Sequence, residues 1–234
     1  MPDKYLYLVL NVAAISIPLA FSFVKRAHFM STYKRILPAL LIPLILFIIW
    51  DVQFTRMGVW GFNDQYLLGL SFLDLPIEEW LFFITIPYAS LFTYFALKHL
   101  KPVQISGSHW IGHFLGTLFL TIGIVNHDKA YTAVTFISLG VFILCLGFLR
   151  KTYLPQFLLS YTLVLIPFFI INGILTGSWI EEPVVWYNDL ENLGIRMGTI
   201  PVEDAFYGML LLLMNLAIWE LASVGSKDKS SSKI

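Results

Sequence analysis

Seven long apolar runs constrain the fold of this chain more than any other feature of its sequence. A helix of about 20 apolar residues is long enough to cross the hydrocarbon core of a bilayer. Hydrophobic residues make up 58% of the chain and charged residues only 13%, which is too little polar surface for a water-soluble globule of 234 residues. The sequence therefore predicts an all-α integral membrane protein. The expected spans are residues 5–24, 36–54, 76–97, 110–125, 131–149, 154–175 and 201–224.

The distribution of basic residues predicts how these spans are oriented. Lysine and arginine collect in the cytoplasmic loops of multi-pass membrane proteins. Of the 15 basic residues, 11 lie after spans one, three, five and seven, and four lie in the opposite set of loops. This asymmetry predicts a multi-pass protein of the cell (inner) membrane, with its N-terminus outside and its C-terminus in the cytoplasm. Residues 225–234 form a polar tail that is expected to be disordered.

Two stretches in the two halves of the chain are copies of one another. Aligned without gaps, residues 60–79 (WGFNDQYLLGLSFLDLPIEE) and 185–204 (VWYNDLENLGIRMGTIPVED) share Asn, Asp, Leu, Gly, Pro and Glu. Since each copy belongs to a group of three spans, an additional span between the groups gives both the same orientation. We therefore expect seven transmembrane helices as two parallel three-helix repeats, residues 1–106 and 130–224, joined by a linking helix within residues 107–129.

In each copy a proline is followed, two residues later, by a pair of acidic residues at the start of an apolar span. Proline suits the first turn of a helix, where its missing N–H costs nothing. Glu78 and Glu203 are suited to accept hydrogen bonds from free N–H groups there, which would be a structural role. Their doubling, with Glu79 and Asp204, favours a function, because ionisable groups at membrane depth are costly. Dry surroundings and a neighbouring acid favour the protonated form of a carboxyl group, so these four residues are candidates for proton transfer.

The acidic motifs and the loops before them resemble a known family. The matching motifs are WD at 50–51, W at 60, FN at 62–63, G at 69, PIEEWLFF at 76–83, PVVWYN at 183–188, G at 194 and IPVEDAFYG at 200–208. Together they resemble the carotenoid lycopene cyclases of the small integral-membrane type. In that family the two halves occur as subunits of a heterodimeric bacterial enzyme, or fused in one chain, or joined to phytoene synthase in fungi. This chain resembles the fused form without the synthase.

The resemblance implies a cofactor-independent cyclisation of the linear ψ-ends of lycopene to β-rings in carotenoid biosynthesis. The enzyme would be an intramolecular lyase or isomerase that needs one acid and one base. Glu78 and Glu203 are expected to lead the proton transfer, and Glu79 and Asp204 to assist them. No cofactor and no metal are expected. Lycopene or a related linear carotenoid, membrane lipid and other carotenoid-pathway enzymes are the implied partners, and nucleic acid is not among them.

A larger set of residues is expected to bind the substrate. Aromatic rings can stabilise a cation through their quadrupoles, and asparagines can orient a carboxyl group. The expected set is Trp60, Phe62, Asn63, Phe82, Phe83, Trp186, Tyr187, Asn188 and Tyr207. Trp and Tyr also form interfacial belts in any membrane protein, and asparagine commonly caps turns. Asp51 aligns with Asn172, which favours a hydrogen-bonding role for it, and Arg196 is expected to pair with a nearby acid.

Two other classes of function remain open at this point. A membrane prenyltransferase of the polyprenyl-lipid type needs spaced acidic clusters to hold Mg²⁺ and diphosphate, whereas the acids here are adjacent. A non-catalytic proton-coupled transporter or scaffold would use Glu78 and Glu203 as relay carboxylates. The flavin-dependent type of cyclase is unsupported, because no G-x-G-x-x-G motif follows a strand.

Overall fold

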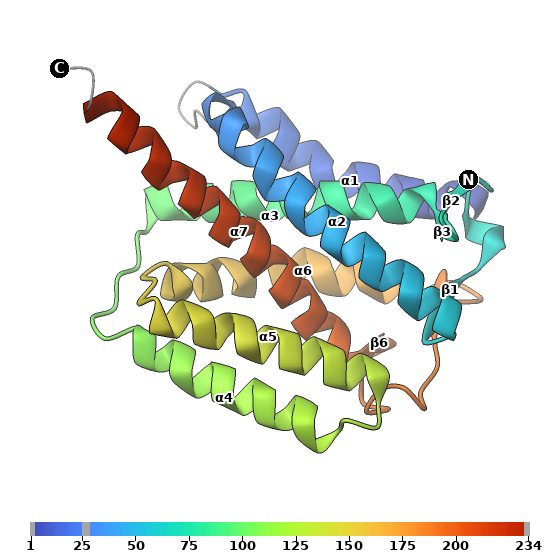
Figure 1. Cartoon of the computed structure of the whole chain (residues 1–234). Helices are drawn as coiled ribbons and strands as arrows, with labels where there is room; N and C mark the ends of the chain where they lie inside the picture. The colour runs from blue at the N-terminus through green and yellow to red at the C-terminus, as the bar shows by residue number, and fades with distance from the viewer. Residues whose placement is uncertain (1–2, 25–28, 232–234) are drawn as a thin grey trace.

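Helices make up most of the computed structural model, which describes residues 3–24 and 29–231, with side chains up to Ala222. Six helical segments in this part of the chain are long and apolar enough to cross a membrane, the first of them Asp3–Ser22, and α4, with 17 residues, is shorter than each of these segments. The prediction of an all-α membrane protein is thus confirmed. The α-helices of the described residues (Figure 1) are α1 (Leu6–Ser22), α2 (Tyr33–Met57), α3 (Ile77–Leu100), α4 (His109–Val125), α5 (Ala130–Phe148), α6 (Leu154–Leu175) and α7 (Val202–Ser231).

Successive helices run in alternating directions along the bundle, so the start of α1 and the end of α7 lie at opposite ends (Figure 1). The backbone of α7 stays helical to Ser231, through most of the segment that was expected to be a disordered tail (residues 225–234). Residues 232–234 lie outside the described residues, as do Lys25 and Arg26, which contributed to the predicted charge asymmetry. Single turns of 3₁₀ helix lie at Asp3–Tyr5 (η1), Phe29–Thr32 (η2) and Asp64–Tyr66 (η3).

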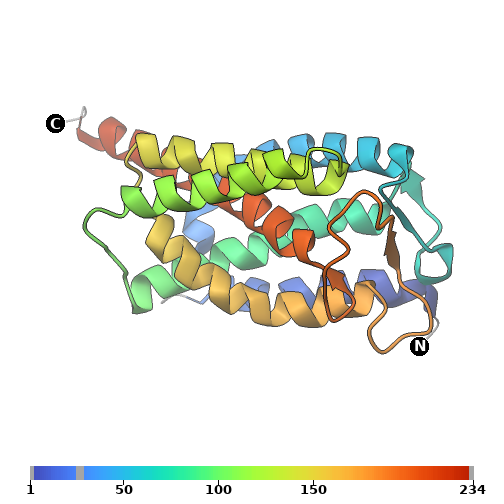
Figure 2. The same cartoon turned by 90° about the horizontal axis from the view of Figure 1, so that it is seen from below.

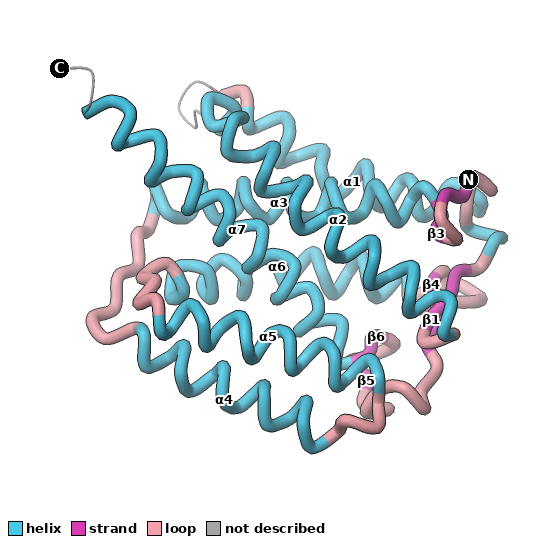
Figure 3. Tube along the Cα trace, in the orientation of Figure 1, coloured by secondary structure: helices cyan, strands magenta, loops and turns pink. Residues whose placement is uncertain are grey.

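The two acid-bearing loops lie at the same end of the bundle and are joined by short strands (Figure 3). Strand β1 (Trp60–Phe62), in the first loop, pairs antiparallel with β4 (Val185–Tyr187), in the second. Each loop then forms a hairpin directly before a helix. These hairpins are β2 (Ser71–Phe72) with β3 (Leu75–Pro76), before α3, and β5 (Arg196–Met197) with β6 (Ile200–Pro201), before α7.

Glycines allow the short helix α4 to lie directly against α5. A Cβ atom built on Gly140 of α5 would lie 2.5 Å from the backbone nitrogen of Leu120, in α4. A Cβ on Gly116 of α4 would lie 2.9 Å from the carbonyl oxygen of Gly140. Small residues permit such close approach of backbones between membrane helices, where van der Waals contact is a main source of attraction. The close contact between α4 and α5 thus depends on glycines, which have no side chain to hold the two backbones apart.

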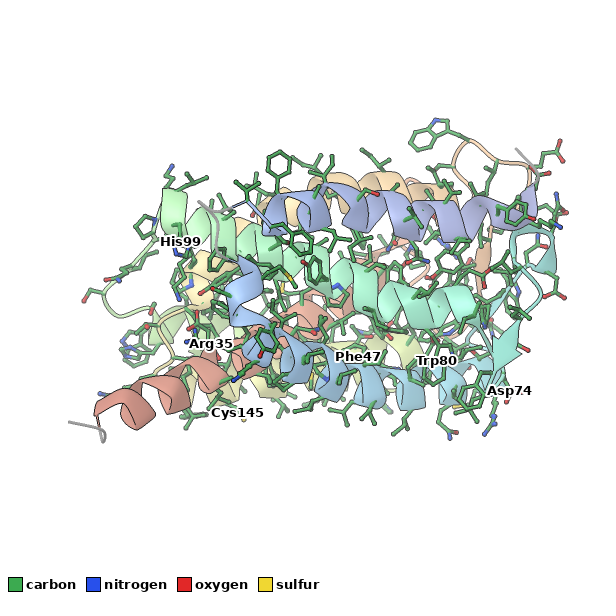
Figure 4. All side chains as sticks on the ribbon, turned by 90° about the horizontal axis from the view of Figure 1, so that it is seen from above. Arg35, Phe47, Asp74, Trp80, His99 and Cys145 are labelled. Carbon is green, nitrogen blue, oxygen red and sulfur yellow. The ribbon has the colours of Figure 1, made fainter. Side chains whose placement is uncertain are left out.

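The bundle has two distinct ends (Figure 4), and aromatic side chains pack against one another between α2 and α7. Figure 4 places Phe47 midway along the bundle, Trp80 and Asp74 towards the loop end, and Arg35 and His99 towards the other end. Phe47 packs edge-on against Tyr207, with ring centroids 5.1 Å apart. This packing holds α2 against α7 midway along the bundle, through a residue of α7 that follows Asp204 by three positions.

Helices α1 and α6 are the most exposed of the long helices. Only 22% of the residues in the apolar window of each are buried, against 44% for α2 and α7. The two helices run along the same edge of the bundle (Figure 2) and contact each other there. This edge is therefore loosely covered by the rest of the chain and exposes apolar side chains.

Candidate functional site

A cavity of about 460 Å³ lies inside the bundle and extends to its loop end. Small-molecule sites commonly have volumes of roughly 300–1,000 Å³. The walls come from α1, α2, α3, α5, α6 and α7 and from the β1–β4 pair, and most lining residues are apolar. Three carboxyl side chains reach this wall, from Asp51 near the end of α2, Glu79 at the start of α3 and Asp204 at the start of α7. The cavity is thus apolar along its length and acidic at one end.

Glu79 and Asp204, the second members of the two acidic pairs, are held in the cavity wall by tyrosines. The hydroxyl of Tyr7 donates to Oε2 of Glu79 at 2.5 Å. Asp204 accepts two such bonds, from Tyr131 at 2.7 Å and from Tyr187 at 2.9 Å. Glu79 is 9% exposed and Asp204 5%. Tyr7 and Tyr131 lie at the starts of α1 and α5, so each half of the chain supplies an acid and a tyrosine that orients it.

Asp51 is a third carboxyl group in the cavity wall. Its Oδ1 accepts a hydrogen bond from the indole N–H of Trp60 at 2.6 Å, whereas its Oδ2 is buried without a partner. The residue is 2% exposed. It shares the wall of the cavity with Glu79. A buried oxygen without a partner is costly when it is charged, and Glu78 and Glu203 each have one such oxygen as well.

Glu78 and Glu203, the first members of the two acidic pairs, do not line the cavity. Both are fully buried, and each accepts a hydrogen bond from a backbone N–H of the loop before its helix. The donors are Leu68 at 2.7 Å and Leu193 at 2.8 Å, respectively. Glu203 also accepts from the hydroxyl of Thr132 at 2.6 Å. The structure thus places the expected leading acids outside the cavity, where they fasten the loops, and the expected assisting acids in its wall.

Aromatic rings surround the acidic end of the cavity. Phe82 and Tyr207 follow Glu79 and Asp204 by three residues, and this spacing puts each ring on the same helix face as its acid. Trp60 and Tyr131 meet edge to face with ring centroids 5.0 Å apart. The electron-rich faces of such rings attract cations. Two further residues that were expected to bind the substrate also line the cavity, namely Phe62 and Tyr187.

The other four residues that were expected to bind the substrate do not line the cavity. Phe83 is buried in the helix core, with its ring centroid 6.1 Å from that of Phe47. Trp186 is 44% exposed and covers Gly61, where even a Cβ atom would lie 2.3 Å from the indole ring. Asn63 and Asn188 accept hydrogen bonds from the backbone N–H two residues later, at 3.1 Å in both loops. The asparagines therefore occupy the turn-capping role that the sequence had left open.

Charge interactions outside the helices fix the second loop. Arg196 forms an ion pair with Asp189, as expected for this arginine. The hydrogen bond from Arg196, together with a second one from Asn192, lowers the pKa of the Asp189 carboxyl group. Burial, followed by the charge of Asp204, raises the pKa of Tyr187 well above its usual value. Tyr187 therefore keeps its proton and remains a hydrogen-bond donor to Asp204.

Two residues at the site were not singled out from the sequence, namely Tyr7 and Tyr131. A signal was present, because a tyrosine occurs close after a lysine at the start of the first span of each repeat. The sequence favoured a hydrogen-bonding role for Asp51, because this residue aligns with Asn172. In the structure both residues line the cavity. Among the described residues, no group of three or more His, Cys, Asp and Glu side chains is arranged to hold a metal ion.

Comparison with known proteins gives one family and two relatives. The model of the family described as "Lycopene cyclase" matches residues 4–97 and 128–222, in two segments that leave out α4. A "Bifunctional lycopene cyclase/phytoene synthase" from Arthroderma gypseum is 24% identical over 188 residues, which cover 73% of this chain and 29% of that protein. A protein of the same description from Leptosphaeria maculans is 24% identical over 175 residues, or 68% of this chain and 28% of that protein.

The chain thus spans less than a third of the length of these curated relatives. No solved structure matches the chain.

Proposed function

Because the chain belongs to the lycopene cyclase family, we propose that it cyclises the linear ψ-ends of lycopene to β-rings within the membrane. The observation that carries this proposal is the meeting of Glu79 and Asp204, one from each matched segment, at the aromatic end of a single apolar cavity. The largely apolar lining of this cavity suits an apolar polyene. The acids lie at the end where its reacting terminus would be bound.

The reaction requires a proton to be supplied at one point and removed at another. A carboxylic acid protonates C2 of the terminal C1–C2 alkene, which leaves a cation at C1. The C5–C6 alkene forms a bond from C6 to C1 and moves the cation to C5. A carboxylate then takes the proton from C6, and the electrons of that C–H bond form the C5–C6 alkene of the β-ring. Substrate and product are isomers, so the class is intramolecular lyase or isomerase.

The hydrogen bonds support different roles for the carboxyl groups. Asp204 accepts from two phenols, and such bonds stabilise a charged carboxylate, which suits the base. Glu79 accepts from one phenol and is assigned as the acid. Asp51, which has one unpartnered oxygen and lines the same cavity as Glu79, is added to this set as a further proton-handling residue. The rings of Trp60 and Tyr207 stabilise the cation.

We extend the proposal to the arrangement of the chain in the membrane. Seven transmembrane helices form two parallel three-helix repeats joined by α4, with the N-terminus outside and the C-terminus in the cytoplasm of a cell (inner) membrane. The family model supports this division, since it matches the two segments on either side of α4. Lycopene or a related linear carotenoid is the proposed substrate. Membrane lipid and other carotenoid-pathway enzymes are the proposed partners.

The test is expression in a lycopene-accumulating bacterium, followed by pigment chromatography. The wild-type chain is expected to convert lycopene to cyclic products. Glu79→Gln and Asp204→Asn should each lower conversion by at least about 10²-fold, the typical effect of losing general acid–base catalysis. Glu78→Gln serves as the matched control, because it changes the adjacent acid outside the cavity. An absence of cyclic product together with proton flux in liposomes would support the rival transporter function instead.

A further inference from the structure

The large cavity has a mouth between α1 and α6. Four of its lining residues belong to the middle of α1, and several more belong to the middle of α6. Two of these lining residues are also largely exposed on the outside of the bundle, Ile17 in α1 by 69% and Ile170 in α6 by 54%. A side chain that both lines a cavity and faces the exterior marks an opening. The opening is therefore in the exposed apolar edge of the bundle, where α1 and α6 run together (Figure 2).

The composition of this mouth favours passage of a long apolar chain. Its α1 side contains Ala13 and Ala14, whose small side chains leave space between the helices. Each of the two helices also has a proline in the mouth, Pro18 and Pro167. A proline inside a helix removes one backbone hydrogen bond and favours a kink. All of the mouth residues named here are apolar.

The position of the mouth relative to the acids fixes the direction of entry. Ala14 and Pro167 lie near the middle of helices that cross the membrane, whereas Glu79 and Asp204 lie at the loop end of the cavity. A molecule dissolved in the hydrocarbon core reaches this mouth without crossing the polar headgroups. Its leading terminus can then advance to the acids while the rest of the chain remains between α1 and α6.

We propose that the gap between α1 and α6 is a lateral portal, through which a linear polyene enters end-first from the bilayer and in which its trailing chain stays bound. This inference rests on the proposed function for the identity of the polyene. It adds a binding site to the acidic end already described. The portal residues are Ala13, Ala14, Ile17, Pro18, Leu163, Val164, Pro167 and Ile170.

The test uses matched pairs of single cysteines in the full chain, with Cys145 changed to Ala because it is exposed. Ile17→Cys and Ile170→Cys lie in the portal. Val12→Cys and Ile166→Cys are their controls on the same helices, since these residues are 54% and 62% exposed and do not line the cavity. The purified proteins in detergent micelles are treated with an apolar maleimide, with and without lycopene, and the rate of modification is measured.

Lycopene should slow modification several-fold at positions 17 and 170 and leave positions 12 and 166 unchanged. A bulky maleimide at position 17 should then abolish lycopene binding, whereas the same group at position 12 should not. Equal protection at all four positions, or none, would overturn the portal. Protection confined to 17 and 170 in a protein that forms no cyclic product would uphold the portal and refute the cyclase function. Cyclic product without selective protection would refute the portal and uphold the cyclase function.

Discussion

At the scale of single residues, the acids of each pair divide into a loop-fastening member and a cavity member. Adjacent positions on a helix point about 100° apart, so Glu78 and Glu79 cannot face the same neighbour. The sequence predicted that the doubled acids matter and located them correctly at the starts of two spans. Which member faces the cavity depends on the rotation of α3 and α7 within the bundle. That rotation is set by packing against distant helices, which the local pattern does not contain.

Replacing Asp51 with Asn tests whether this residue handles a proton. An amide oxygen can still accept the hydrogen bond from Trp60, but the side chain no longer carries a transferable proton. Cyclisation is expected to fall by about 10²-fold, with the pH dependence of the rate altered and little change in the thermal unfolding temperature. Rates and unfolding are measured on purified protein in detergent. A rate and pH profile equal to those of the wild type would show that Asp51 acts only as a hydrogen-bond acceptor.

Replacing Glu78 or Glu203 separates a structural role from a catalytic one. Glu78→Ala leaves the Leu68 N–H without its acceptor, which should lower the free energy of unfolding by roughly 1–3 kcal/mol. Glu203→Ala should cost more, because Thr132 also loses its partner. Glu78→Gln and Glu203→Gln keep an accepting oxygen and should retain activity within several-fold. If both Gln variants unfold normally yet fail to cyclise lycopene, the expectation drawn from the sequence, that these two acids lead the proton transfer, would be right.

At the scale of secondary structure, the sequence located the helices well and the strands not at all. The expected spans 110–125 and 154–175 correspond closely to α4 and α6, because apolar length is a local property. The pairing of β1 with β4 joins loops that are far apart in the sequence. Three-residue strands carry no recognisable alternation, so only the folded chain reveals them. The repeated loop motif did predict that the two loops are alike.

The α4–α5 contact gives a prediction for these elements. Gly140→Ala places a methyl group 2.5 Å from backbone that cannot rotate away, so α4 must move, at a cost of roughly 1–3 kcal/mol. The thermal unfolding temperature in detergent should fall. Gly173→Ala is the matched control, because the nearest atom to its added methyl lies at 3.6 Å, an ordinary contact. Equal stability of the two variants would contradict the close packing of α4 on α5.

At the scale of the whole molecule, the two acid-bearing loops close one end of the bundle, and the proposed topology puts that end outside the cell. In a Cys145→Ala background, a cysteine at Gln65, which is exposed in the first loop, should react with an impermeant thiol reagent in intact cells. Cysteines at Ser31 and Ser230 should react only after the cells are opened. Rapid labelling of Ser31→Cys in sealed cells would show that the topology is opposite to the one proposed.

The central claim is that carboxyl groups at the loop end of the cavity start the cyclisation by protonating the substrate. Its most direct test is mass spectrometry of the product that the purified chain forms from lycopene in D₂O. The account predicts a product with one solvent deuterium per ring, at C2, formed without added nicotinamide, flavin or metal, and formed at least about 10²-fold more slowly by Glu79→Gln. Rings without solvent deuterium, or wild-type rates of deuterium incorporation in both Glu79→Gln and Asp204→Asn, would contradict it.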